Sequence, residues 1–144
     1  MIAAVFGDFD HVGWVVRDLD EAASWAREAL GLELARTATL PQYGIDAYFL
    51  GPGSGTLEIF TLADAGLLDA RLEGQPRRLD HVAFRVQGID ALTAMLRASG
   101  ARFCTPDRAQ EIAEPLEVGP MRQIWTVPAS TGGLALQLNE PLAH

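Results

Sequence analysis

Two histidines, one carboxylate and one amide are the polar side chains of this sequence whose spacing can support chemistry. His11 and His81 lie 70 residues apart, each between an aspartate and a valine at the head of an apolar, alternating stretch. Glu58 lies in a later alternating stretch of the half that contains His11, and Gln137 lies in a later alternating stretch of the half that contains His81. Imidazole and carboxylate groups can move protons or bind cations, and an amide oxygen is an acceptor. Whether these four groups act together depends on the elements that position them.

An internal repeat relates the two halves of the chain. A shift of 70 residues places Asp10-His11-Val12 on Asp80-His81-Val82 and aligns three further identical pairs: Val16 with Val86, Asp20 with Asp90, and Arg27 with Arg97. The order of predicted elements also matches, which is harder to obtain by chance than single identities. The sequence therefore predicts a duplicated module.

Each half is predicted to have the element order β-α-β-β-β. In the first half, a strand, a helix and three strands are expected at 9–16, 20–30, 33–40, 44–51 and 55–62. In the second half, the same elements are expected at 79–86, 88–99, 102–106, 118–127 and 133–139. Residues 1–62 would form the first module, 63–78 a connector with a short helix, and 79–144 the second module. The predicted fold is one α+β domain whose mixed sheet curls around a central cleft.

Alternation along the predicted strands assigns side chains to the two faces of the sheet. The rows expected to pack against the helices are Val12, Trp14 and Val16; Leu57 and Ile59; Val82, Phe84 and Val86; and Leu134, Leu136 and Leu138. The opposite face then receives His11, Glu58, His81 and Gln137, from equivalent strands of the two halves.

Composition excludes several classes of function. The net charge of −8 argues against binding to nucleic acid or to an anionic membrane. No apolar run approaches the roughly 18 residues of a membrane span, and the first residues lack the basic start of a signal peptide. Cys104 is the single cysteine, so an intramolecular disulfide is impossible. We expect a cytoplasmic protein that binds a small molecule.

The stretch DHVGWVVRDLDEAASWAREALGLEL resembles the opening signature of the vicinal oxygen chelate superfamily. That superfamily includes glyoxalase I, methylmalonyl-CoA epimerase, extradiol dioxygenases, and fosfomycin- and bleomycin-resistance proteins. PQYGIDAYFLGPGSGTLEIF and VPASTGGLALQLNEP are similar to the epimerase members in particular. The resemblance covers nearly the whole chain and implies paired β-α-β-β-β modules around a divalent metal, in a homodimer.

The resemblance implies a ligand set of His11, Glu58, His81 and Gln137, with Gln137 at a position that usually carries glutamate. Two imidazoles, one carboxylate and one amide oxygen suit Co²⁺, Ni²⁺, Zn²⁺, Mn²⁺ or Fe²⁺. Such a metal is a Lewis acid that can polarise a carbonyl and hold an enolate.

The resemblance also raises the question of which group moves the proton. The position of the epimerase glutamate corresponds best to Gln42, and an amide cannot take a proton. Asp46 and Tyr48 share the Gln42 face by alternation and are the predicted catalytic residues. The predicted substrate-binding residues are Gln42, Phe60, Arg85, Met121 and Trp125, with Arg85 as a partner for a carboxylate or phosphate.

Three functions remain open on the sequence. The first is a metal-dependent isomerase, epimerase or lyase that polarises a carbonyl and moves the proton α to it, in a small acyl or carbonyl metabolite. The second is a metal-free protein that binds a ligand or sequesters an antibiotic. The third is an Fe²⁺ extradiol-type dioxygenase that uses His11, His81 and Glu58.

Overall fold

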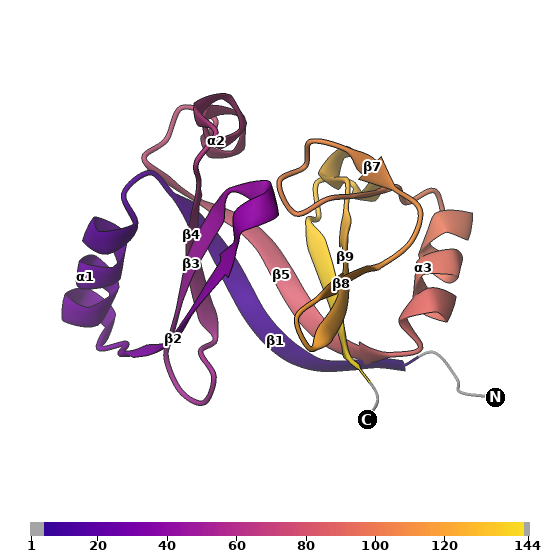
Figure 1. Ribbon diagram of the computed structural model, residues 1–144, viewed down its shortest axis with the longest axis horizontal. Helices are drawn as coiled ribbons and strands as arrows, with labels where there is room; N and C mark the ends of the chain where they lie inside the picture. The colour runs from indigo at the N-terminus through magenta and orange to yellow at the C-terminus, as the bar shows by residue number, and fades with distance from the viewer. Residues whose placement is uncertain (1–4, 143–144) are drawn as a thin grey trace. The chain divides into compact units, whose positions relative to one another are not determined.

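The computed structural model describes residues 5–142 (Figure 1). The elements of the first half are β1 (Val5–Val16), α1 (Leu19–Leu30), β2 (Leu34–Leu40), the 3₁₀ turn η1 (Pro41–Tyr43), β3 (Ile45–Leu50), β4 (Leu57–Leu62) and α2 (Ala65–Leu72). All five predicted elements of this half are present, and α2 is the short helix expected in the connector. β1 begins four residues before its predicted start at residue 9.

The second half contains more strands than the sequence predicts. Its elements are β5 (Arg77–Gln87), α3 (Ile89–Ala98), β6 (Phe103–Cys104), β7 (Glu111–Ile112), β8 (Leu116–Val118), β9 (Met121–Thr126), the 3₁₀ turn η2 (Pro128–Thr131) and β10 (Leu136–Pro141). β7 and β8 were not predicted, because two or three residues are too few for a strand to show its alternating pattern.

The ten strands of the described chain form one mixed sheet that does not close, with three α-helices, which confirms the α+β class. The strand order is β2-β3-β4-β1-β5-β10-β9-β6-β7, and β8 pairs with β9. The chain divides into two compact units: an N-terminal unit of residues 11–80, and a C-terminal unit of residues 81–142 with residues 5–10. β1 and β5 contribute residues to both units.

In the N-terminal unit, each face of the sheet carries a buried hydrophobic cluster. The first turn of α1 is capped by Asp18, whose side chain accepts a hydrogen bond from the backbone N–H of Glu21, and the helix ends at Gly31 with φ 69°. One face of the sheet packs under α1 as the α1 cluster, which contains Val16, Ala22, Ala26, Leu50 and Ile59. The other face packs against α2 as the α2 cluster, which contains Val15, Ala47, Phe49, Phe60 and Leu72.

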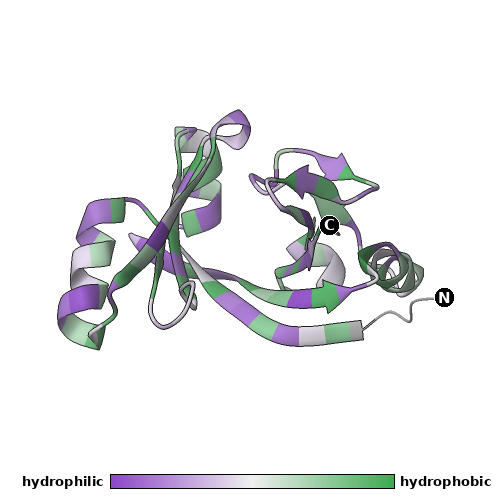
Figure 2. Ribbon diagram, turned by 60° about the horizontal axis from the view of Figure 1, so that its bottom comes forward, coloured by the Kyte–Doolittle hydropathy of each residue, from purple (hydrophilic) through white to green (hydrophobic). Residues whose placement is uncertain are grey.

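In the C-terminal unit, one face of the sheet packs under α3. This α3 cluster contains Val86, Ile89, Leu92, Phe103, Ile124, Leu136 and Leu138, with Val82 and Phe84 at its edge. The long strands show alternating hydrophobic and hydrophilic bands in Figure 2, as expected when successive side chains point to opposite faces of the sheet.

The predicted rows on β4 and β5 are confirmed, since Ile59 is buried with Leu57 beside it, and Val86 is buried with Val82 and Phe84 beside it. The prediction for Leu134 is wrong. Its side chain is 52% exposed, because β10 begins only at Leu136 and Leu134 lies in the turn that follows η2.

No helix of the described chain is long and apolar enough to cross a membrane.

Candidate metal centre

The N-terminal unit brings His11 and Glu58 together on the face of the α2 cluster. β1 and β4 are parallel and pair Gly13 with Glu58, so Glu58 lies diagonally across from His11. His11 is 3% exposed, and its Nε2 lies 3.3 Å from Oε1 of Glu58. The edge of the His11 ring meets the ring of Phe49, with centroids 5.2 Å apart and planes at 88°. These two neighbours hold the orientation of the imidazole.

The C-terminal unit presents His81 and Gln137 on the sheet face opposite the α3 cluster. β5 and β10 are parallel and pair Ala83 with Gln137, and His81 shares the face of Ala83 by alternation. Both side chains are buried, His81 at 9% and Gln137 at 6% exposure. The Gln137 amide nitrogen donates to Oδ1 of Asn139 at 2.9 Å. This bond directs the amide and leaves its carbonyl oxygen as the atom that could bind a metal.

The two units place equivalent residues in equivalent cross-strand rows. In the N-terminal unit, the row across β1, β4, β3 and β2 is Gly13, Glu58, Phe49 and Arg36. In the C-terminal unit, the row across β5, β10, β9 and β6 is Ala83, Gln137, Trp125 and Cys104. The proposed ligands Glu58 on β4 and Gln137 on β10 therefore each pair with an aromatic residue on the neighbouring strand. Phe49 was missed by the sequence reasoning, and its equivalence to Trp125 is the signal that identifies it.

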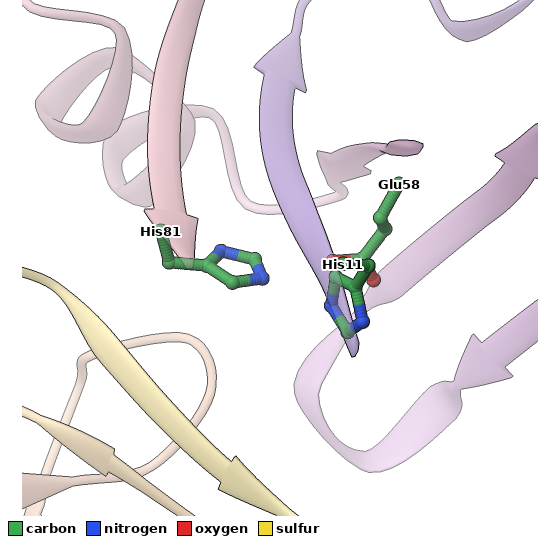
Figure 3. Close-up of side chains that lie close together, drawn as sticks. All are labelled: His11, Glu58 and His81. Atoms are coloured by element: carbon green, nitrogen blue, oxygen red, sulfur yellow. Dashed lines mark ion pairs between the residues drawn. The ribbon is translucent and has the colours of Figure 1, made fainter. Parts of the chain in front are cut away.

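The donor types of these residues fit a divalent metal. Figure 3 shows His11, Glu58 and His81, which come from β1, β4 and β5. They are residue types that could hold a metal ion, and Gln137 adds an amide oxygen. Two neutral imidazoles with oxygen donors suit first-row divalent ions.

The structure places Asp46 and Tyr48 on the opposite face from His11 and Glu58. Tyr48 pairs with Ile59 across β3 and β4 and packs on the α1 cluster, and Asp46 is exposed on the same side. The hydroxyl of Tyr48 donates to Oδ1 of Asp20 at 2.8 Å, and this bond to a carboxylate raises the pKa of Tyr48. The geometry of the N-terminal unit therefore gives no support to the catalytic role predicted for Asp46 and Tyr48.

The tyrosine that packs on the α2 cluster is Tyr43, in η1. Gln42, the preceding residue, is exposed. Phe60 is 2% exposed within the α2 cluster, and the guanidinium of Arg71 lies 5.2 Å from its ring centroid. Phe60 thus shares the His11 face, as predicted, as part of a packed core.

The remaining predicted substrate-binding residues lie in the C-terminal unit. Trp125 is 8% exposed, and Met121, at the start of β9, shares its face by alternation and is half-buried. Arg85 is about half exposed and forms an ion pair with Asp10, Nη2 to Oδ1, at 3.4 Å. Their roles in binding stay predictions.

A buried ion pair precedes His81. Arg71 on α2 donates from Nε and Nη2 to the two carboxylate oxygens of Asp80 at 3.0 and 2.8 Å, and the side chains are 5% and 0% exposed. The sequence reasoning missed Arg71, because no periodic pattern relates the connector to the strand that follows it. The pair fixes the backbone of β5 next to a proposed ligand.

Each half of the chain has an opening strand with a histidine, then a helix and further strands, which defines a duplicated α+β protein. Residues 10–115 match the family model described as the glyoxalase/bleomycin resistance protein/dioxygenase superfamily. The chain belongs to this superfamily, which confirms the resemblance.

Relatives with assigned activities include epimerases. The chain is 25% identical over 136 residues to mitochondrial methylmalonyl-CoA epimerase of Mus musculus, covering 93% of this chain and 73% of that protein. It is 28% identical over 100 residues to ethylmalonyl-CoA/methylmalonyl-CoA epimerase of Cereibacter sphaeroides, covering 68% of this chain and 75% of that protein. The crystal structure of methylmalonyl-CoA epimerase from Mycobacterium tuberculosis superposes with a TM-score of 0.78 at 24% identity and shows the same fold. The superposition covers 99% of this chain and 94% of the epimerase chain. These relatives support the prediction of an enzyme of the isomerase class.

Proposed function

We propose that the protein is a metal-dependent epimerase or isomerase that moves the proton on the α-carbon of an acyl-CoA thioester. The observation that carries the proposal is the matched placement of two ligand pairs, His11 with Glu58 in one unit and His81 with Gln137 in the other. The relatives that are named for methylmalonyl- and ethylmalonyl-CoA supply the substrate class.

In this proposal the four side chains bind one divalent ion: Co²⁺, Ni²⁺, Zn²⁺, Mn²⁺ or Fe²⁺. A single carboxylate against a dication leaves the site with a net positive charge. When bound, the metal polarises the thioester carbonyl and stabilises the negative charge that develops as the α-proton leaves.

The chain's own residues would orient the substrate and exclude water. Phe49 and Trp125 flank the proposed ligands Glu58 and Gln137, and both aromatic side chains are buried. Aromatic walls of this kind lower the local dielectric, which strengthens the electrostatic interactions of the enolate.

Tyr43 is the group we propose for proton transfer in the N-terminal unit. It directly follows Gln42 and packs on the cluster that contains Phe60, on the His11 face. As the phenolate, Tyr43 would take the α-proton and become the phenol, and the phenol would return a proton to the α-carbon, whereas an amide can do neither. The proposal makes no use of Asp46 or Tyr48.

The test is solvent-deuterium exchange at the α-carbon of methylmalonyl- and ethylmalonyl-CoA in D₂O, followed by proton NMR. Metal-loaded protein should remove the α-proton signal faster than a protein-free control, and Tyr43→Phe should slow the exchange by about 10²-fold or more. Exchange at the control rate with both thioesters would refute the proposal. Oxygen consumption with a catechol would point instead to the dioxygenase alternative.

The homodimer and the cytoplasmic location implied by the sequence stay predictions, and analytical ultracentrifugation tests the former.

A further inference from the structure

The C-terminal unit contains a cavity that includes none of the proposed metal ligands. Its volume is about 470 Å³, and its wall includes Cys104, Arg108, Gln110, Val127 and Pro128, together with Glu111, whose carboxylate is paired with Arg102. This volume lies within the range of roughly 300–1,000 Å³ that is typical of small-molecule sites. The loop from β6 to β7 forms one side of it, in orange in Figure 1.

Cross-strand pairing connects the cavity to Gln137. Cys104 in the cavity wall pairs with Trp125 across β6 and β9, and Trp125 pairs with Gln137 across β9 and β10. Phe103 and Ile124 belong to the α3 cluster, so their neighbours Cys104 and Trp125 point to the opposite face, which is the face of Gln137. Two strand spacings amount to about 10 Å. A molecule bound at Gln137 could therefore reach the cavity with an arm of about this length.

The loop that carries Arg108 is held by its own hydrogen bonds. The backbone N–H of Thr105 donates to the carbonyl of Gln110 at 2.9 Å, and the N–H of Arg108 donates to the carbonyl of Thr105 at 2.9 Å. The carboxylate of Asp107 accepts bonds from the Thr105 hydroxyl at 2.6 Å and from the Ala109 N–H at 3.0 Å. These bonds fix the loop in one conformation.

Arg108 has a backbone conformation that side-chain-bearing residues rarely adopt. Its φ is +61°, in the left-handed region where glycine would cost less. Residues held in this way gather at binding and catalytic sites, because the surrounding structure has to maintain them. A guanidinium presented from a fixed backbone loses little freedom when it binds, and its planar fork matches the oxygens of a carboxylate or phosphate.

We propose that this cavity binds an oxyanion group of the substrate and that Arg108 is the residue that pairs with it. The proposal rests on the proposed acyl-CoA reaction. The oxyanion is either a carboxylate of the acyl group or a phosphate of the CoA carrier. The walls formed by Cys104, Val127 and Pro128 would contact the carbon chain that leads to it.

The test compares Arg108→Gln with Arg17→Gln, which makes the same charge change at an exposed arginine that pairs with Asp69, away from the cavity wall. Calorimetric titration of the metal-loaded protein with methylmalonyl-CoA should give a Kd about 10–100-fold higher for Arg108→Gln, and an unchanged Kd for Arg17→Gln. In the exchange assay, KM should rise by a similar factor while kcat changes little. Arg108→Gly relaxes the backbone at φ +61° and so retains the fold, and it should lose binding to the same degree.

Titration with the N-acetylcysteamine thioester of the same acid, which carries no phosphate, identifies the group. A loss that persists with this thioester assigns a carboxylate to Arg108, and a loss seen only with the CoA thioester assigns a phosphate. Equal Kd values for wild type and both Arg108 variants with the CoA thioester would overturn the site. Binding that depends on Arg108, without α-proton exchange, would overturn the proposed reaction and keep the site. Exchange and binding that do not depend on Arg108 would overturn the site and keep the proposed reaction.

Discussion

Removal of Arg71 should cost the fold far more than removal of an ordinary surface arginine. Arg71→Met leaves the Asp80 carboxylate, which is 0% exposed, without the two hydrogen bonds of 3.0 and 2.8 Å that the guanidinium donates. Breaking a buried pair by deleting one partner costs about 3–5 kcal/mol. In a chain of this size each kcal/mol lowers Tm by about 2–4 °C, so we expect a fall of roughly 6–20 °C.

A double-mutant cycle measured by urea unfolding with circular dichroism tests this reasoning. Arg71→Met combined with Asp80→Leu removes both charges, so it should recover much of the stability lost by the single variant, with a coupling energy of about 2 kcal/mol or more. Arg17→Met is the control, because Arg17 pairs with Asp69 where the side chains are 54% and 63% exposed, and such pairs contribute less than about 1 kcal/mol. Single costs that simply add would refute the account of a coupled buried pair.

Three further predictions concern single side chains. Gln137→Glu adds an anionic oxygen to the proposed ligands, so the metal Kd measured by competition with a chromophoric chelator should fall, and weaker binding would contradict the assignment. The hydrogen bond to Asp20 raises the pKa of Tyr48 above 10.0. The bond therefore stabilises the fold fully below pH 10, and this stabilisation is lost as the pH rises through the pKa of Tyr48 in the folded state. Asp20→Asn should therefore move the Tyr48 step in an ultraviolet titration to lower pH, and an unchanged step would count against the bond. Hydrogen bonds from Arg122 lower the pKa of Asp90 below 3.8. The ionised pair therefore stabilises the fold at neutral pH, and this stabilisation is lost as the pH falls through the lowered pKa of Asp90. Asp90→Asn should therefore cost less than about 1 kcal/mol near neutral pH, with a difference from wild type that shrinks in acid, and a constant difference would contradict this origin.

The parts of the fold that depend on local patterns could be predicted from the sequence. Alternation within one strand is a property of the backbone, so it correctly assigned Ile59 and Val86 to the helix-covered faces. The same parity brought His11 and Glu58 to a common face, where they lie 3.3 Å apart. The 70-residue shift then identified His81 as the counterpart of His11, and alternation along the last strand of the second half identified Gln137 as the counterpart of Glu58.

The face of β3 could not be predicted, because it depends on the register between two strands. The hairpin pairs Tyr48 with Ile59 and Phe49 with Glu58, which puts Phe49 on the His11 face and Tyr48 under α1. A shift of one residue would exchange these faces, and the glycine-containing loop between β3 and β4 does not reveal the register. Tyr43 was passed over for a related reason, since η1 interrupts the alternation before β3 begins.

Contacts between distant segments were also beyond the sequence. Arg71 and Asp80 belong to different elements, and only the packing of α2 brings them together. Arg108 lies in a loop between two strands of two residues each, where no periodic signal exists. Its left-handed backbone is a property of the folded loop alone.

The metal content of protein prepared without chelators tests the central claim most directly. Elemental analysis of wild type should find about one divalent ion per chain, and His11→Ala and His81→Ala should each lose it, although the two histidines belong to different units. Circular dichroism should show that both variants remain folded. An unchanged metal stoichiometry in a folded His81→Ala variant would contradict a site shared by the two halves of the repeat.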